Sequence, residues 1–175
     1  MKNLPLRWLF FNNILILVLL TGLSSCDNTG KVSEQLLTDQ EKQVEKQRII
    51  QTLNKYNQGA NERKWDLMVE TLANEIVFFG TDKGESAKNF QEFKLTIQKQ
   101  WNEYEILYYG DFDSTDAFIS IDDYARYANA IYGSIVIYGK KDNPDTLYTV
   151  TQRTLRKDVQ KDIWEIQSGI LAVLR

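Results

Sequence analysis

The sequence predicts an α+β domain in which about three N-terminal helices pack on one face of an antiparallel sheet. Two observations support this class. Apolar residues recur at helical spacing up to residue 101, and from residue 104 onward the chain is rich in strand-forming residues separated by turns. Helices first and consecutive strands afterwards are typical of α+β domains.

A separate N-terminal segment precedes this domain. Lys2 and Arg7 give it a positive start, residues 9–20 are mostly apolar, and Leu23-Ser24-Ser25 leads to Cys26, the only cysteine of the chain. The pattern resembles the signal peptide and lipobox of a bacterial lipoprotein. A roughly 12-residue apolar run reaches about 18 Å as a helix, short of the hydrocarbon core of about 30 Å, so a permanent membrane span is disfavoured.

We therefore expect a lipoprotein signal peptide over residues 1–25 and a lipidated Cys26. A flexible polar tether is expected up to residue 38, and one folded domain over residues 39–175. The lipid would anchor the protein to a membrane of the bacterial cell envelope, and the sequence leaves inner and outer membrane open.

Composition excludes several functions. The 175 residues include no histidine and carry a net charge of −3. Ser-His-Asp and Cys-His catalysis and histidine metal sites are therefore excluded, and nucleic acid is not an expected partner. With one cysteine there is no intrachain disulfide and no cysteine-rich zinc site, so we expect no metal and no cofactor. Any catalysis would depend on Asp, Glu, Tyr, Lys or Arg.

The helical part begins at Asp39, where apolar residues follow at helical spacing. This first helix is expected to end at Gln58-Gly59, because glycine suits a helix C-terminus. A shorter helix follows over residues 65–72. Residues 75–79 read as a strand closed by Gly80, residues 81–84 as a turn, and residues 90–101 as a third helix.

The second half reads as five strands joined by turns. They are expected at residues 104–109, 117–121, 125–138, 148–156 and 163–174.

Residues 76–85, Ile-Val-Phe-Phe-Gly-Thr-Asp-Lys-Gly-Glu, resemble an element of the SnoaL-like proteins in the NTF2-like superfamily. In that element a strand ends in a Gly-Thr-Asp turn and a glutamate follows before the third helix. Trp164-Glu165-Ile166 resembles the Trp-x-Ile of the family's last strand, and Arg153-Thr154 resembles its preceding strand. The resemblance covers roughly residues 40–175.

The resemblance implies a cone, with a curved sheet wrapped around helices and often a pocket inside. It also implies members of very different activity, so the fold transfers no function by itself. Many members carry histidines after the Trp-x-Ile. Here the corresponding positions hold Ser168, Ile170 and Ala172, which weakens any transfer of acid–base chemistry.

Three carboxylates are candidates for catalysis. Asp82 and Glu85 flank the Gly-containing turn, where a carboxylate near an apolar pocket is a possible general base. A structural role is preferred for both, because the turn and the start of the third helix account for them. Asp123 follows Asp122 after a short strand, and a solvated turn is the preferred interpretation of this pair.

Five further residues are candidates for lining a pocket: Trp101, Tyr108, Tyr127, Arg153 and Trp164. A tyrosine in a sheet more often supplies packing area than catalysis. Arg153 suits an anionic ligand, although a cross-strand ion pair with Glu165 is the preferred alternative.

Three functions remain open. The favoured one is a non-catalytic domain that binds a small apolar or amphipathic ligand. The alternatives are an isomerase- or dehydratase-type enzyme using a pocket carboxylate and a tyrosine, and an envelope interaction module that forms a homodimer through its sheet.

Overall fold

The computed structural model describes residues 36–81, 83–110, 112 and 115–174. The expected signal peptide over residues 1–25, the lipidation site Cys26 and nearly all of the tether lie outside the described residues, as does Asp82. Within the described ranges, no helix combines the length and apolar character needed to cross a membrane.

The order of helices and strands matches the sequence prediction closely. The elements are α2 (Asp39–Asn61), α3 (Trp65–Val69), β1 (Leu72–Phe79), the short 3-10 helix η1 (Lys83–Glu85), α4 (Phe90–Glu103), β2 (Ile106–Tyr109), β3 (Phe118–Ile121), β4 (Tyr127–Lys140), β5 (Asn143–Asp158) and β6 (Ile163–Val173). Helix α2 begins with a capping box, in which Thr38 accepts from the Glu41 amide and Glu41 accepts from Thr38.

The expected end of the first helix at Gly59 is wrong, because α2 continues to Asn61. Gly59 is buried, and a Cβ atom there would lie 2.8 Å from both Cγ and the backbone nitrogen of Met68. This glycine therefore allows α3 to pack against α2, and the left-handed position after the helix is taken by Arg63, at φ 55°.

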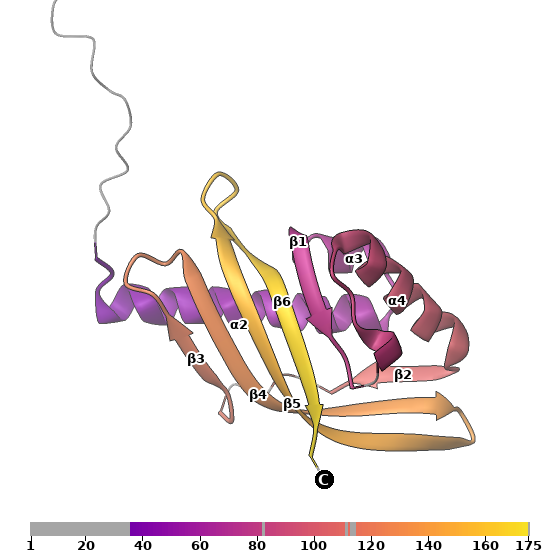
Figure 1. Cartoon of the computed structure of the whole chain (residues 1–175). Helices are drawn as coiled ribbons and strands as arrows, with labels where there is room; N and C mark the ends of the chain where they lie inside the picture. The colour runs from indigo at the N-terminus through magenta and orange to yellow at the C-terminus, as the bar shows by residue number, and fades with distance from the viewer. Residues whose placement is uncertain (1–35, 82, 111, 113–114, 175) are drawn as a thin grey trace, which may run out of the picture. The chain divides into compact units, whose positions relative to one another are not determined.

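The strands form one sheet in the order β1-β6-β5-β4-β2, and β3 pairs with another part of β4. Figure 1 shows the sheet curling around α2, with α3 and α4 beside β1. The predicted sheet was wholly antiparallel, but β1 runs parallel to β6, with Phe78 opposite Gly169. Such a pair needs a long crossover, which the elements from η1 to β5 supply.

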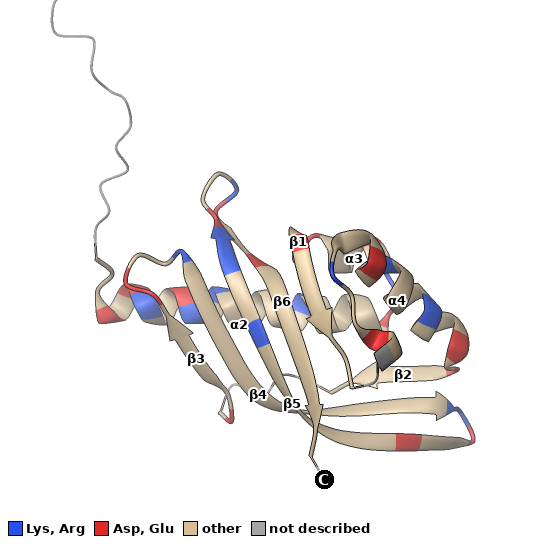
Figure 2. Ribbon diagram, in the orientation of Figure 1, with Lys and Arg blue, Asp and Glu red and all other residues tan. Residues whose placement is uncertain are grey.

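Side chains alternate across the long strands, and this alternation defines the inner face of the cone. On β4, Ala128, Ala130 and Tyr132 are buried, whereas Tyr127 and Ile131 are exposed. The buried side chains of α2 and α4 complete the core from the helix side. Figure 2 shows charged residues mainly on the helices and near the ends of the strands.

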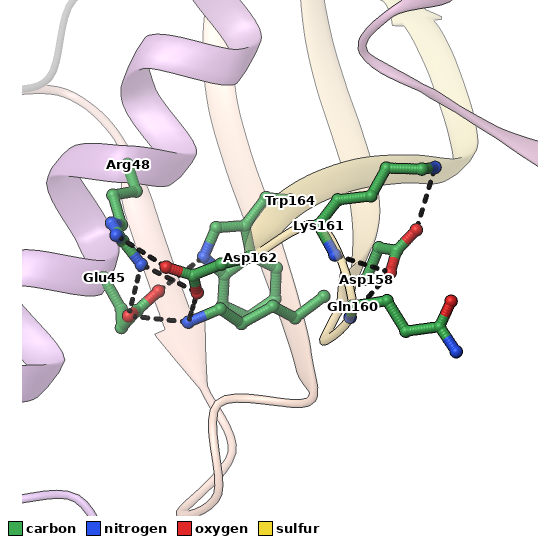
Figure 3. A network of polar contacts seen from close by, with 8 residues as sticks. Glu45, Arg48, Asp158, Gln160, Lys161, Asp162 and Trp164 are labelled. Atoms are coloured by element: carbon green, nitrogen blue, oxygen red, sulfur yellow. Dashed lines mark hydrogen bonds and ion pairs between the residues drawn. The ribbon is translucent and has the colours of Figure 1, made fainter.

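A polar network fixes α2 to the β5–β6 hairpin (Figure 3). The Glu45 carboxylate is buried and accepts from Trp164 Nε1 at 2.7 Å and from Lys157 Nζ at 2.8 Å. Arg48 donates to both carboxylate oxygens of Asp162, and Lys157 also pairs with Asp162. Because each charge has an opposite partner, the network holds helix and hairpin together without an isolated buried charge.

Candidate functional site

Arg153 lies inside the cone, in the middle of β5. It pairs in register with Ala130 of β4 and Gly169 of β6, and its side chain is among the buried polar groups, with 4% of the residue exposed. Its guanidinium carbon lies 5.0 Å from the ring centroid of Tyr56 and 5.3 Å from that of Phe78. The cation is thus held by aromatic rings from α2 and β1.

Tyrosines dominate the electrostatics around this arginine. Burial alone would lower the pKa of Arg153, but the nearby phenols of Tyr56 and Tyr132 outweigh that effect and the pKa is raised. Burial raises the pKa of Tyr56 and of Tyr109 above the ordinary value, so both phenols stay protonated at neutral pH. The guanidinium therefore remains a cation among neutral hydroxyl groups.

The preferred ion pair between Arg153 and Glu165 is not formed, and that expectation is wrong. Arg153 lies opposite Gly169, and Glu165 lies opposite Arg156, three residues further along β5. Glu165 instead lies 3.7 Å from Arg156 Nη2 and accepts from Lys161 Nζ at 3.0 Å. Among the described residues no carboxylate pairs with Arg153, and its buried Nε has no hydrogen-bond partner.

A cavity of about 70 Å³ lies between α4 and the inner face of the sheet. Its walls include Phe78, Glu85, Gln100, Tyr109 and Leu171. Phe78 and Tyr109 also border Arg153, so the cavity adjoins the surroundings of the buried cation. This volume is well below the roughly 300 Å³ at which pockets for drug-sized ligands begin, and the cavity suits only a small group.

Glu85 lies in the wall of this cavity but is held by its neighbours. One carboxylate oxygen accepts from the Thr81 amide at 3.0 Å and hydroxyl at 2.9 Å, and the other accepts from Gln100 Nε2 at 2.9 Å. The preferred structural role of this residue in its turn therefore agrees with the contacts. The Gln100 side chain donates through Nε2, but its Oε1 is buried and has no hydrogen-bond partner.

Asp123 lies away from the cone. It is exposed and pairs with Lys42 Nζ at 2.7 Å. Its neighbour Asp122 accepts from the amides of Arg126 and Tyr127, as expected for a carboxylate that stabilises a turn. The pair therefore forms the β3–β4 turn, and no group of three or more potential metal ligands occurs in the described part of the chain.

The other four pocket candidates are dispersed. Tyr108 and Tyr127 are exposed, at 39% and 50% of their surface. Trp101 is half-buried and donates to the Ala60 carbonyl at 3.2 Å, and Trp164 is buried in the network with Glu45. None of the five candidates is among the described residues that line the cavity, although Arg153 shares the neighbours Phe78 and Tyr109 with it.

Sequence reasoning missed the groups that surround Arg153. Tyr56 falls within the range predicted as the first helix and Phe78 within a predicted strand, and the sequence assigned neither residue a role in a site. The sequence gives only a weak signal for Gln100, namely its position one residue before Trp101 in α4. These residues come from separate elements, and only the folded chain brings them together.

The outer face of the sheet carries exposed apolar side chains. Phe118 pairs with Ile131 across β3 and β4, and Ile135 pairs with Tyr148 across β4 and β5, all at least 40% exposed. Ile170 of β6 adds to this face at 45% exposure.

A curled sheet that encloses helices in this order defines an α+β cone of the NTF2-like, or cystatin-like, type. Solved structures show the same fold. An NTF2-like protein with a cystatin-like fold from Novosphingobium aromaticivorans aligns with a TM-score of 0.60 at 13% identity, over 86% of this chain and 92% of that one.

Two further solved structures share this fold. A type 3 hexachlorocyclohexane dehydrochlorinase from Novosphingobium barchaimii aligns with a TM-score of 0.63 at 8% identity, over 79% of this chain and 92% of its own. A protein of unknown function from Mycobacterium tuberculosis aligns with a TM-score of 0.65 at 15% identity, over 85% of this chain and 79% of that one. No family model and no curated protein sequence matches this chain. The similarity therefore establishes the fold alone.

Proposed function

We propose that this chain is a lipoprotein of the bacterial envelope whose cone binds a small molecule without transforming it. The observation that carries the proposal is the cavity beside Arg153, in whose wall the buried Gln100 Oε1 lacks a partner. A buried polar atom without a partner is costly unless a water or a ligand satisfies it. The small volume favours a small ligand, or one that inserts only its end.

A test is to purify the full-length chain from its own membranes in detergent, denature it and identify released small molecules by mass spectrometry. The control is Val136→Phe, which fills the cavity from the buried inner face of β4. We expect a molecule from the wild type that is absent from a folded Val136→Phe protein. Equal release from both would contradict binding in this cavity.

The membrane anchor is tested separately. Cys26→Ser should leave the precursor unprocessed and abolish lipid attachment, measured by mass spectrometry and membrane fractionation. Ser24→Ala keeps a small residue in the same segment and should be processed normally. Membrane association of Cys26→Ser equal to that of the wild type would contradict a lipid anchor.

An enzyme is the second candidate, because Glu85, Tyr104 and Tyr109 line the same cavity. A carboxylate base and a protonated phenol are the groups that a proton-transfer reaction needs. The three hydrogen bonds that Glu85 accepts disfavour this role. Incubating the released molecule with fresh protein distinguishes the candidates, since an enzyme would convert it and Glu85→Gln would not.

Self-association through the outer sheet face is a further proposal, supported by its exposed apolar residues. The lipid-free chain should form a dimer in analytical ultracentrifugation. Ile135→Lys should shift it to monomer, whereas Val159→Lys, in the β5–β6 turn, should not. A wild-type monomer at all concentrations would contradict this proposal.

A further inference from the structure

We infer that the end of the domain at which α2 begins contacts the membrane and inserts apolar side chains between the lipids. This inference rests on the proposed lipid anchor and goes beyond it, because a lipid on Cys26 does not by itself orient the domain. The surface consists of three segments: the start of α2 (36–39), the β3–β4 turn (122–126) and the β5–β6 turn (159–162). We call them together the tether end.

Printed contacts of the backbone make these three segments neighbours. The Leu37 amide donates to the Asp123 carbonyl at 2.9 Å, which brings the start of α2 beside the β3–β4 turn. The Lys157 amide donates to the Arg126 carbonyl at 2.9 Å, which brings that turn beside the end of β5. Lys42 Nζ adds an ion pair with Asp123 at 2.7 Å. The tether end is therefore one connected surface of the folded domain.

Each segment of the tether end exposes an apolar or aromatic side chain. Leu36 is 60% exposed, Tyr124 38% and Val159 66%. The Arg126 guanidinium carbon lies 4.8 Å from the ring centroid of Tyr124. Tyrosine and arginine have an apolar body and a polar tip, which suits them to the boundary between lipid and water. One exposed apolar side chain is ordinary, but here three neighbouring segments each present one.

The charges of the tether end do not oppose contact with a lipid surface. Each aspartate in and beside the two turns is paired with a cation: Asp122 with Arg126, Asp123 with Lys42, Asp158 with Lys161, and Asp162 with Arg48 and Lys157. Because these carboxylates are matched, the contact depends on the apolar side chains, and we expect it on lipids without net charge.

The bilayer is the expected partner because the tether joins the domain at this end. Leu36 follows Cys26 by ten residues, and an extended chain of that length spans at most about 36 Å. The β4–β5 turn lies at the far end of the long hairpin (Figure 1), and Thr146 is separated from Asp158 by about 40 Å along β5. A lipid on Cys26 would therefore hold the tether end nearer to the bilayer than the β4–β5 turn.

Spin labelling of the full-length lipidated chain tests this orientation. Cys26 is the only cysteine, and the lipid would block its thiol, so an introduced cysteine becomes the single labelling site. Val159→Cys and Tyr124→Cys place the label at the tether end, and Thr146→Cys, on the exposed far end of β5, is the matched control. Each protein is reconstituted into phosphatidylcholine vesicles, and electron paramagnetic resonance measures collisions of the label with oxygen and with a water-soluble nickel chelate.

Labels at residues 159 and 124 should be several-fold less accessible to the nickel chelate than the label at residue 146, and more accessible to oxygen, which concentrates in lipid. Equal access of the chelate to all three labels would overturn the inference and leave the anchor intact. Shielding of residues 159 and 124 from both reagents would indicate contact with protein and would also overturn it. Labelling of Cys26 in the otherwise unchanged chain would refute the lipid anchor, and the inference with it.

Discussion

Gly169 lies opposite Arg153 in the β5–β6 pair, and a Cβ at residue 169 would lie only 1.8 Å from Arg153 Nη1. The same Cβ would lie 3.0 Å from the Phe78 ring. The absence of a side chain at residue 169 thus provides the space in which the guanidinium folds against β6. The placement of the buried cation depends on this glycine as much as on Arg153 itself.

Gly169→Ala should therefore lower the free energy of unfolding by about 1–3 kcal/mol, the usual cost of overpacking. In an Arg153→Met background the same substitution should cost less, because the shorter side chain leaves the space free. Denaturant unfolding of the four proteins measures the coupling. Gly133→Ala on β4 is the control, since a Cβ there meets nothing within 4 Å; additive losses would contradict the relationship.

Glu45→Ala should destabilise the domain strongly. It removes the acceptor for Trp164 Nε1 and one partner of Lys157, both of which stay buried or nearly so. Removing one member of a buried ion pair costs about 3–5 kcal/mol. Thermal and denaturant unfolding should show a decrease in the free energy of unfolding near the lower end of this range. Glu103→Ala, at the exposed end of α4, should change little. Equal losses in both would rule out a stabilising network.

Asp162 should make stability depend on pH in the acid range. Hydrogen bonds from Arg48 and Lys157 lower its pKa from 3.8 to about 2. A lowered folded-state pKa contributes stability that is complete above the unfolded value and disappears as pH falls through about 2. The stability difference between the wild type and Asp162→Asn, measured by urea unfolding, should narrow from pH 5 to pH 2. A constant difference would contradict the pairing.

Alkaline pH should destabilise the cone. The pKa values of Tyr56 and Tyr109 are raised chiefly by burial, whereas unfolded tyrosines ionise near pH 10. The stability from these neutral phenols is therefore complete below pH 10 and is lost as pH rises further. Absorbance at 295 nm should show Tyr56 and Tyr109 ionising in a late phase, above pH 10. Tyr109→Phe should reduce the late phase, which Tyr56 shares, and an unchanged late phase would contradict this assignment.

The sequence predicted the elements well because their signals are local. Apolar spacing defined α2 and α4, and the clusters of strand formers defined β2 to β6, mostly within a few residues of their ends. The two errors come from contacts distant in sequence. Residue 59 is a glycine because a Cβ there would collide with Met68 of α3. The direction of β1 is set by its pairing with β6.

The site was predictable only in part. An arginine on a strand of hydroxyl-bearing residues suggested an anion site, but its neighbours depended on the pairing of β5 with β6, which places Arg153 opposite Gly169. Glu165 lies opposite Arg156 instead, and no turn or motif in the sequence signals this pairing. The tyrosines around Arg153 come from α2, β2 and β4, and their convergence depends on how the sheet curls.

The parallel pairing of β1 with β6 also constrains the order in which the chain becomes structured. Val77 meets its partner Ser168 only after the intervening α4 and four strands have been made. Such distant pairings slow folding, because loop closure must precede the stabilising contacts. On a ribosome or during passage through a translocation channel, β1 would stay without its neighbour until the last strand emerges. The first strand of the sheet is then among the last to be completed, and the cone cannot close around Arg153 before β6 has emerged.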